Sequence, residues 1–266
     1  MGQKGLFAAP ENRTGVTVKS HRELDLMRQA GQVVAETPSK LIASVGPGMR
    51  TRELDAIARQ EIKRLGAKPA FLGYLGFPAT ICVSINEQIV HGIPGERVLQ
   101  EGDLVKLDAG AIIDGFYADS AVTVGVGKIT KEAQRLVDTT RVALEKGMQM
   151  ARGGTRIGNI GSAVEEYSEL RGYGVVREYV GHGIGRALHE EPQIPNYGKN
   201  GKGFLLHSGM TIAIEPMLNV GTWRTRVLDD EWTVVTEDGE LSAHFEHTIA
   251  IKEDGPHILS KVQSNG

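Results

Sequence analysis

The segment VKLDAGAIIDGFYADSAVTV, residues 105–124, constrains the fold more strongly than any other part of this sequence. Two apolar runs flank Asp114-Gly115, and an Asp-Gly pair between such runs is typical of a two-residue hairpin turn. Each run carries one carboxylate, Asp108 before the turn and Asp119 after it. Because burying an ionised carboxylate costs free energy unless a positive group compensates it, the segment predicts both a hairpin and a cation.

The two-residue turn also predicts the register of this hairpin. Asp108 would lie opposite Ala121, and Asp119 opposite Gly110, so that both carboxylates lie on one face of the sheet. As diagonal neighbours, their Cα atoms would be about 7–8 Å apart, and both carboxylates could reach one divalent ion. For Asp108 alone, the alternative is an ordinary ion pair with Lys106, which lies on the same face.

Helices followed by strands occur twice along the chain. Ser20 and Glu23 form a capping-box pattern that begins a helix over 20–45. A second helix is expected over 51–67, with Thr51 as its N-cap and its end near Gly66. Helical spacing returns at 131–150 and 157–171. Strand-like runs are found at 79–85, 88–93, 174–180, 209–217, 231–236 and 244–251. We expect residues 1–20 to form an extended arm, and residues 21–266 to form one domain with pseudo-repeats at 21–128 and 129–255.

The repeat is most evident in polar positions. When GDLVKLDAG is set over GMTIAIEPM, YADSAVTV over HFEHTIAI, and IVHGIPG over VGHGIG, most residues differ, but acids and histidines coincide. This pattern indicates a duplication whose two halves face one central site. The coinciding pairs are Asp108 with Glu215, Asp119 with Glu246, and His91 with His182.

These acids and histidines predict a centre with two metal ions. Four carboxylates carry a formal charge of about −4, which two divalent ions would neutralise. An imidazole such as that of His182 is a good ligand for transition metals and a poor one for Mg or Ca, so we expect Co, Mn, Fe or Zn. Two such ions about 3.5–4 Å apart can share a water and lower its pKa, which supplies hydroxide near neutral pH. Taken singly, His182 could be structural, and Glu246 beside His247 could lie on an exposed rim.

The composition argues against several other classes of protein. The chain has 266 residues, of which 40% are hydrophobic and 24% charged, and its net charge of −3 does not favour a nucleic-acid or membrane partner. Its single cysteine, Cys82, excludes an internal disulfide framework and favours a reducing compartment. No stretch reaches the ~18 apolar residues of a membrane span. We therefore expect a soluble, cytoplasmic protein.

The motifs KLDAG, YADSA, GHGIGRALHEEPQIPNYG, AIEPM and FEHTI, in this order, resemble those of type I methionine aminopeptidases over about residues 20–255. The resemblance implies the α+β pita-bread fold, with two pseudo-symmetric halves around a central antiparallel sheet and helices on the outer face. It also implies the metal ligands. Asp119 and Glu246 would bridge two ions, Asp108 would complete the shell of one ion, and His182 with Glu215 would complete the other.

The reaction that the resemblance implies is hydrolytic removal of the initiator methionine from nascent polypeptides. A metal-activated hydroxide would be the nucleophile, and Glu215 the proton shuttle. His91 and His189 match positions that hydrogen-bond the substrate and stabilise the tetrahedral intermediate. An apolar pocket for the methionine side chain would consist of Tyr74, Phe77, Cys82 and Trp232, each of which could otherwise be a plain core residue.

Other positions bear on details of the site and its partners. Leu75 lies where some family members have histidine, and Leu188 lies where an aromatic residue is common, so the shape of the pocket is expected to differ. A monovalent-cation site of some members is matched by Asn86, Gln88 and Ser242. The resemblance also implies a monomer that acts on the N-termini of nascent chains, including chains at the ribosome.

Two other functions compete with this interpretation. A related Xaa-Pro aminopeptidase or prolidase would resemble this fold, but those enzymes typically carry a large extra N-terminal domain. Here only about twenty residues precede the first expected helix. An inactive relative that binds ribosomes or other partners would have lost ligands, whereas all five ligand positions are filled.

Overall fold

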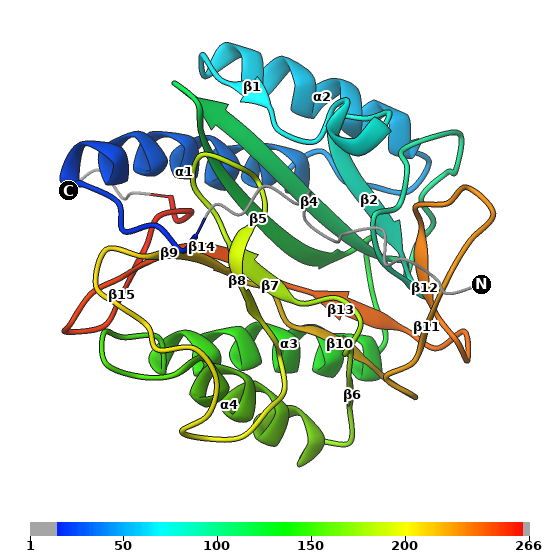
Figure 1. Cartoon of the computed structure of the whole chain (residues 1–266). Coiled ribbons are helices and arrows are strands. Elements are labelled where there is room, and N and C mark those ends of the chain that lie inside the picture. Colours follow the sequence, from blue (N-terminus) through cyan, green and yellow to red (C-terminus); the bar gives the residue numbers. More distant parts are fainter. Residues whose placement is uncertain (1–14, 263–266) are drawn as a thin grey trace.

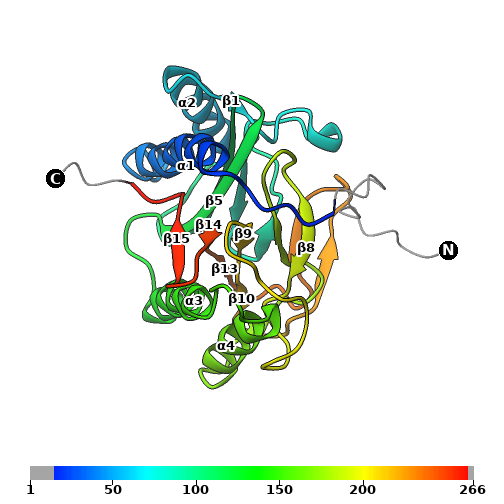
Figure 2. The same cartoon turned by 60° about the vertical axis from the view of Figure 1, so that its left-hand side comes forward.

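A computed structural model describes residues 15–262, and its strands lie between two pairs of helices. In Figure 1 one pair lies along the top and the other along the bottom, and Figure 2 shows the same layers after rotation. The antiparallel strands and outer helices form the α+β architecture predicted from the sequence. The helices are α1 (His21–Ile42), α2 (Thr51–Arg64), α3 (Lys131–Gln149) and α4 (Ile157–Glu169).

The helices begin where local hydrogen bonding predicts, with one correction. At α1 the predicted capping box is confirmed, because Ser20 Oγ accepts from Glu23 N and Glu23 Oε2 accepts from Ser20 N. The prediction that Thr51 caps α2 is wrong, since the N-cap is Arg50. The Thr51 hydroxyl instead donates to Gly95 O at 3.1 Å, so a tertiary contact replaces the local cap.

The first sheet contains the predicted hairpin in its predicted register. β4 (Leu104–Ile113) pairs with β5 (Phe116–Gly125), with Asp108 opposite Ala121 and Asp119 opposite Gly110. β1 (Lys68–Pro69) and β2 (Ile81–Ile85) pair with the other edge of β4. Helix α1 packs against both β4 and β5, so it covers this hairpin.

The second half places its acids at breaks between strands. The sequence predicts continuous strands over 209–217 and 244–251, but β9 (Thr211–Ile214) and β10 (Met217–Asn219) are separate, as are β13 (Ser242–His244) and β14 (His247–Ile251). One physical cause is Pro216, which has no N–H to donate to a ladder. β9 pairs with β14 and β10 with β13 in one continuous register, so Glu215 lies opposite Glu246 across the break.

Hydrogen bonds join the two halves along β5. Glu246 N donates to Ala121 O at 2.9 Å, and the Thr248 hydroxyl donates to Asp119 O at 2.8 Å. Further along β5, Thr123 Oγ1 donates to His244 O at 2.7 Å. The strands that carry the acids of both halves are therefore fixed side by side.

The remaining strands complete three small sheets. The predicted strand over 174–180 is much shorter, as β6 (Gly174–Val175). A five-stranded sheet adds β7 (Gly181–Gly183), β8 (Glu190–Ile194) and β15 (Pro256–Ile258) to β9 and β14. A three-stranded sheet consists of β3 (Gln88–Val90), β11 (Thr225–Val227) and β12 (Val234–Thr236), and a short 3₁₀ turn, η1, covers Tyr74–Gly76.

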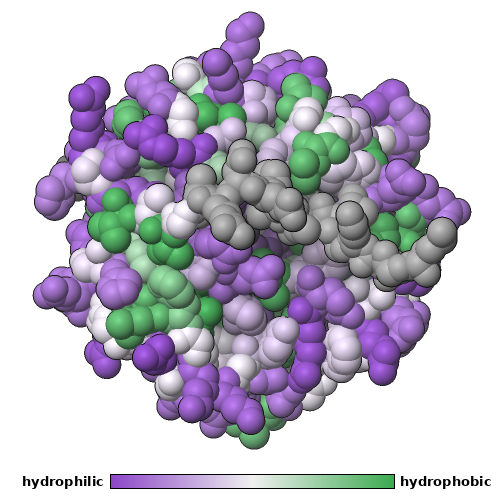
Figure 3. Space-filling view, in the orientation of Figure 1, coloured by the Kyte–Doolittle hydropathy of each residue, from purple (hydrophilic) through white to green (hydrophobic). Residues whose placement is uncertain are grey.

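The core and surface match those of a water-exposed globular protein. Apolar side chains such as Met27, Leu54, Leu107 and Ile249 are fully buried between helices and sheets. On the face seen in Figure 3, hydrophilic side chains predominate and apolar ones form local groups among them. Within residues 15–262, no helix has both the length and the apolar character needed to cross a bilayer.

Candidate metal centre and active site

A pocket at the junction of the two halves brings together all five predicted ligand residues. β4 and β5 contribute one acid each, β7 contributes the histidine, and the two strand breaks contribute the glutamates. The five are Asp108, Asp119, His182, Glu215 and Glu246.

The distances among these side chains suit a shared ion. Ligand atoms of Asp119, His182 and Glu246 all lie within 4.8 Å of one another. His182 Nε2 lies 3.4 Å from Asp119 Oδ2 and 3.6 Å from Glu215 Oε1. Its other ring nitrogen, Nδ1, lies 2.9 Å from the Gly183 carbonyl oxygen. That contact holds a proton on Nδ1, so Nε2 is the ring nitrogen that faces the acids and would bind a metal after losing its proton.

The electrostatics of the pocket require a cation. Burial raises the pKa of Asp108 and Glu246 well above their usual values, with a further contribution from the charge of Asp119, and burial raises the pKa of Glu215 to about 8. Burial alone would lower the pKa of His182, but the charges of Asp119 and Glu215 raise it to about 9. Asp108 Oδ1 is buried and has no hydrogen-bond partner among the described residues. These residues therefore fit a divalent transition metal, which their carboxylate oxygens and the imidazole would bind jointly.

For Asp108 and Glu246, the alternatives to a metal site are wrong: Asp108 is not an ion-pair partner of Lys106, and Glu246 is not a surface residue. Lys106 does not pair with Asp108, because its ammonium donates to two backbone carbonyl groups elsewhere. Glu246 is not on an exposed rim, since its residue is only 3% exposed. Both acids are directed into the pocket that His182 also lines.

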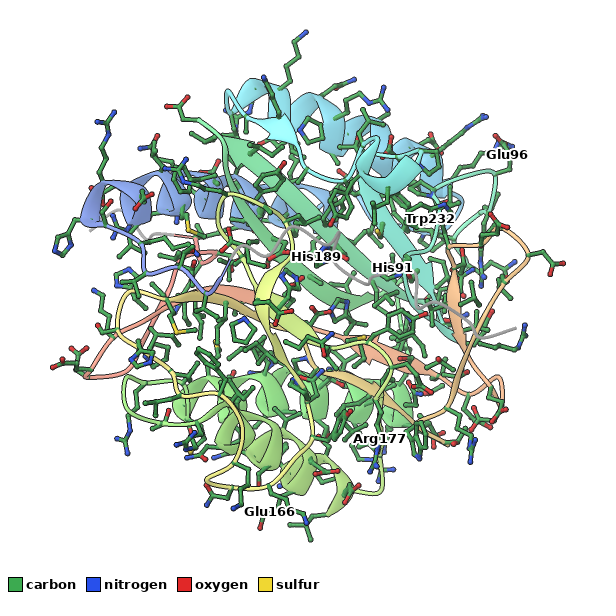
Figure 4. The ribbon with its side chains drawn as sticks, in the orientation of Figure 1. His91, Glu96, Glu166, Arg177, His189 and Trp232 are labelled. Atoms are coloured by element: carbon green, nitrogen blue, oxygen red, sulfur yellow. The ribbon has the colours of Figure 1, made fainter. Side chains whose placement is uncertain are left out.

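Two further histidines and a tyrosine line the same pocket. In Figure 4, His91 and His189 lie near each other between the helical layers, whereas Glu96 and Glu166 lie at the periphery. Burial lowers the pKa of His91 to about 4 and that of His189 still further, so both rings are neutral at physiological pH. The Tyr74 hydroxyl lies 2.7 Å from His189 Nδ1, a contact that the sequence did not suggest.

The predicted methionine pocket adjoins these polar groups. Tyr74, Phe77, Cys82 and Trp232 all line the cavity, and the rings of Phe77 and Trp232 meet edge to face with their centroids 5.1 Å apart. Two more lining residues were not predicted as such. One is Phe71, the first residue of segment 71–82, which contains three of the predicted pocket residues. The other is Leu188, which was expected only to alter the shape of the pocket.

Two residues that lie next to Glu215 were also missed, and of these only Asn196 forms a hydrogen bond with it. Asn196 Nδ2 donates to Glu215 O at 3.0 Å, and His244 Nε2 lies 3.9 Å from Glu215 Oε2. Neither residue is close to Glu215 in sequence. The only available signal was His244 in HFEH, two positions before Glu246.

The three residues of the predicted monovalent-cation site do not line this pocket. Asn86 O and Ser242 O both accept hydrogen bonds from Lys106 Nζ, at 2.6 and 2.9 Å. The Gln88 side chain accepts from Ile85 N at 2.8 Å. The carbonyl groups of Asn86 and Ser242 are therefore already bound to the Lys106 ammonium and are not available to a free ion in this arrangement.

Comparisons with known proteins show the family of this chain. The model of metallopeptidase family M24 matches residues 25–253. Methionine aminopeptidase 1 of Bacillus subtilis is 51% identical over 247 residues, which cover 93% of this chain and 100% of the relative. The methionine aminopeptidase of Clostridium perfringens is 47% identical over 248 residues, with coverage of 93% and 100%. The crystal structure of a methionine aminopeptidase from Thermotoga maritima has a TM-score of 0.92 at 45% identity and covers 93% of this chain and 100% of that chain.

The chain therefore belongs to metallopeptidase family M24 and has its pita-bread fold. Within that family it groups with the methionine aminopeptidases, whose full length it matches. The prolidase from Pyrococcus furiosus has a TM-score of 0.75 at 24% identity, and this chain covers 66% of it. That likeness shows the shared fold alone and does not favour the Xaa-Pro alternative.

Proposed function

We propose that this protein removes N-terminal methionine from polypeptides and that the five ligand residues hold two divalent ions, which are Co, Mn, Fe or Zn. The observation that carries the proposal is the meeting of two unlike surfaces in one pocket. Buried acids around His182 suit metal ions, while the rings of Phe77 and Trp232 and the thiol of Cys82 suit the thioether of methionine.

The metal ions, when bound, would polarise the scissile carbonyl and lower the pKa of a water held between them. The side chains of the chain itself then have distinct roles. Asp119 and Glu246 would contribute to holding both ions, Asp108 would help to hold one of them, and His182 with Glu215 would help to hold the other. Once metal binding has released its own proton, the Glu215 carboxylate would accept a proton from the attacking water and pass it to the leaving amine.

His189 is assigned to stabilise the oxyanion, and Tyr74 to orient it. The neutral imidazole of His189 has one N–H donor, whose position depends on the tautomer. The Tyr74 hydroxyl can donate to Nδ1 at 2.7 Å, which leaves the proton on Nε2. Nε2–H can then donate to substrate, together with His91, which lines the same pocket.

Tyr74→Phe tests this orientation. We expect kcat on a Met-Ala-Ser peptide to fall by roughly 10-fold, because one hydrogen bond that fixes the tautomer is lost. KM and metal affinity should stay unchanged, since the ring still packs in the pocket. Steady-state kinetics and metal titration measure both, with Tyr167→Phe on α4 as the control. An unchanged kcat, or a change confined to KM, would contradict the assignment.

Trp232→Ala tests the methionine pocket. Removing the indole exposes Phe77 and lowers the apolar area that the substrate side chain can bury, so we expect kcat/KM to fall by roughly 10- to 200-fold. Metal content should be unaffected. The control is Trp223→Ala, because Trp223 stacks against Arg177 instead. Equal effects of the two substitutions would mean that Trp232 acts through stability and not through the pocket.

The proposed activity itself is tested with two peptides. Purified protein supplied with Mn or Co should release methionine from Met-Ala-Ser and leave an Xaa-Pro peptide intact. Release from the Xaa-Pro peptide would support the prolidase-like alternative. Tight metal binding with neither activity would support the inactive binding relative.

We further propose that the substrates are nascent chains in the cytoplasm, including chains at the ribosome, and that the protein acts as a monomer without nucleic acid or membrane. The net charge of −3 supports the absence of a polyanionic partner. We also propose that residues 21–128 and 129–255 are pseudo-repeats of one domain preceded by the arm at 1–20, of which residues 1–14 lie outside the described part of the chain. The placement of α1–α2 and α3–α4 on opposite sides of the strands supports the repeat (Figure 1).

A further inference from the structure

Lys106 is a buried cation next to the metal centre without an acidic partner. It lies on β4 and is only 1% exposed. Its ammonium donates to Asn86 O at 2.6 Å and to Ser242 O at 2.9 Å. Among residues 15–262, no carboxylate lies within ion-pair distance of Nζ. A buried charge is costly unless polar groups compensate it. These two carbonyl groups contact the ammonium directly, and the charges of Glu87 and Asp103 act on it from further away.

The two carbonyl groups come from different halves of the molecule. Asn86 lies in the turn between β2 and β3 with a φ of 53°, and Ser242 begins β13. Ser242 N also donates to Asn86 O, at 3.1 Å. Asn86 O thus accepts two hydrogen bonds, which uses both of its lone pairs. No lone pair of that oxygen is left for a separate ion.

The side chain of Asn86 fixes this carbonyl in place. Its Nδ2 donates to Asp103 Oδ1 at 2.8 Å, and its Oδ1 accepts from Leu104 N at 2.8 Å. Asp103 in turn accepts from Gln100 N. These bonds hold the carbonyl oxygen in the position at which it accepts from the Lys106 ammonium.

We propose that Lys106 is a built-in monovalent cation, which occupies the carbonyl site at Asn86 and Ser242 and makes this chain independent of added potassium or sodium. The expected free-ion site at Asn86, Gln88 and Ser242 therefore does not fit this sequence. The proposal concerns the fold and its ion requirement, so it does not depend on which peptide the active site cleaves.

The position of Lys106 explains why a cation is useful there. Lys106 precedes Asp108 by two residues, and Ser242 precedes Glu246 by four. One ammonium group therefore ties the strand of a first-half ligand to the strand that leads to a second-half ligand.

Thermal unfolding of the metal-loaded protein at pH 6.5 tests the proposal. Melting temperatures are compared in potassium chloride and in choline chloride at equal ionic strength, since choline is too large for a site lined by two carbonyls. Wild type should melt at the same temperature in both salts. Lys106→Ala should melt roughly 5–15 °C lower in choline chloride, because two buried carbonyls lose their donor.

Potassium or ammonium ions should partly rescue Lys106→Ala. At ten times the dissociation constant, the gain should be roughly 3–6 °C. Lys106→Met removes the same charge but fills the space, so it should lose stability without rescue. Lys199→Ala, at an exposed lysine, is the control and should behave as wild type.

Two results would overturn the proposal. The first is a wild-type protein that is stabilised by potassium and not by choline, which would show that a separate ion binds. The second is an equal response of Lys106→Ala and Lys106→Met to potassium, which would show that the vacated carbonyls do not bind a cation. Because unfolding is measured and not turnover, neither result would bear on the proposed peptidase activity.

Discussion

Asp119→Asn should lower kcat/KM on a Met-Ala-Ser peptide by roughly 10³-fold or more. Asp119 is proposed to help hold both ions, and an amide in its place would weaken their binding. Bound ions would supply several kcal/mol of transition-state stabilisation, and each 1.36 kcal/mol is about tenfold in rate. Asp119 shares the compact cluster of ligand atoms with His182 and Glu246, whereas Asp108 lies outside that cluster. Removal of the Asp119 charge therefore affects more of the site than removal of the Asp108 charge would.

The same substitution should leave the metal-free protein folded. The Thr248 hydroxyl donates to both Asp119 O and Asp119 Oδ1 at 2.8 Å, and the carbonyl oxygen of an asparagine can keep the second bond. One negative charge disappears from a buried cluster of acids, so the metal-free melting temperature should be equal to or higher than that of wild type.

Kinetics, metal analysis and thermal unfolding together check this prediction, with Asp138→Asn on the exposed face of α3 as the matched control. We expect the control to match wild type in all three measurements. If Asp119→Asn retained near-normal turnover, the assigned metal site would be wrong. If the Asp119→Asn variant failed to fold without metal, the main role of Asp119 would be to stabilise the fold and not to bind metal.

The first half of the site could be derived from sequence because its information is local. A two-residue turn at Asp114-Gly115 determines every pair of the β4–β5 ladder, so the positions of Asp108 and Asp119 follow from counting residues. The capping box at Ser20 is likewise a local pattern. Neither inference needs knowledge of any distant contact.

The second half was predicted less well because its geometry depends on distant partners. Glu215 and Glu246 lie at strand breaks, and the break at Glu246 is stabilised by a hydrogen bond from its N–H to Ala121 O on β5. That acceptor is more than a hundred residues away, so apolar alternation alone suggested an unbroken strand. Pro216 was the one local signal that the ladder is interrupted.

Side-chain partners across the pocket were not predictable at all from spacing. The bond between Tyr74 and His189 joins residues 115 positions apart. Lys106 was weighed as a partner of Asp108 because both lie on one face of β4, yet its long side chain reaches Ser242, 136 positions away. Flexible side chains can satisfy several partners from one backbone position, so the choice among them is made by the tertiary fold.

Without metal, the free energy of unfolding should fall as the pH rises towards 8, whereas the stabilisation by added metal should increase. In the metal-free protein, burial raises the pKa of Glu215 from its usual 4.5 to about 8. The folded state therefore binds this proton more tightly than the unfolded state does. Its contribution to stability is fully present below about pH 4.5 and is lost as the pH rises through about 8. Several buried histidines, including His91 and His189, have lowered pKa values and act in the opposite direction below about pH 6.5. The metal-free protein should thus lose stability between about pH 6.5 and 8.

Metal binding should have the opposite dependence. Carboxylate and imidazole ligands must release their protons before they bind a metal, so affinity rises with pH over the same range. The gain in melting temperature on adding Mn should be small near pH 5. Near pH 8 it should reach roughly 8–16 °C when the metal concentration is a thousand times the dissociation constant.

Thermal unfolding from pH 5 to 8, with a chelator or with Mn, measures both trends, and Glu215→Gln is the control. A glutamine side chain cannot titrate, so the metal-free variant should lose less stability with rising pH than metal-free wild type, and its gain from Mn should be smaller at pH 8. If metal-free wild type and the variant had the same pH dependence, the carboxyl group of Glu215 would not be the protonated group. If Mn stabilised wild type equally at pH 5 and pH 8, the buried acids would not be its ligands, because no proton would be displaced when it binds.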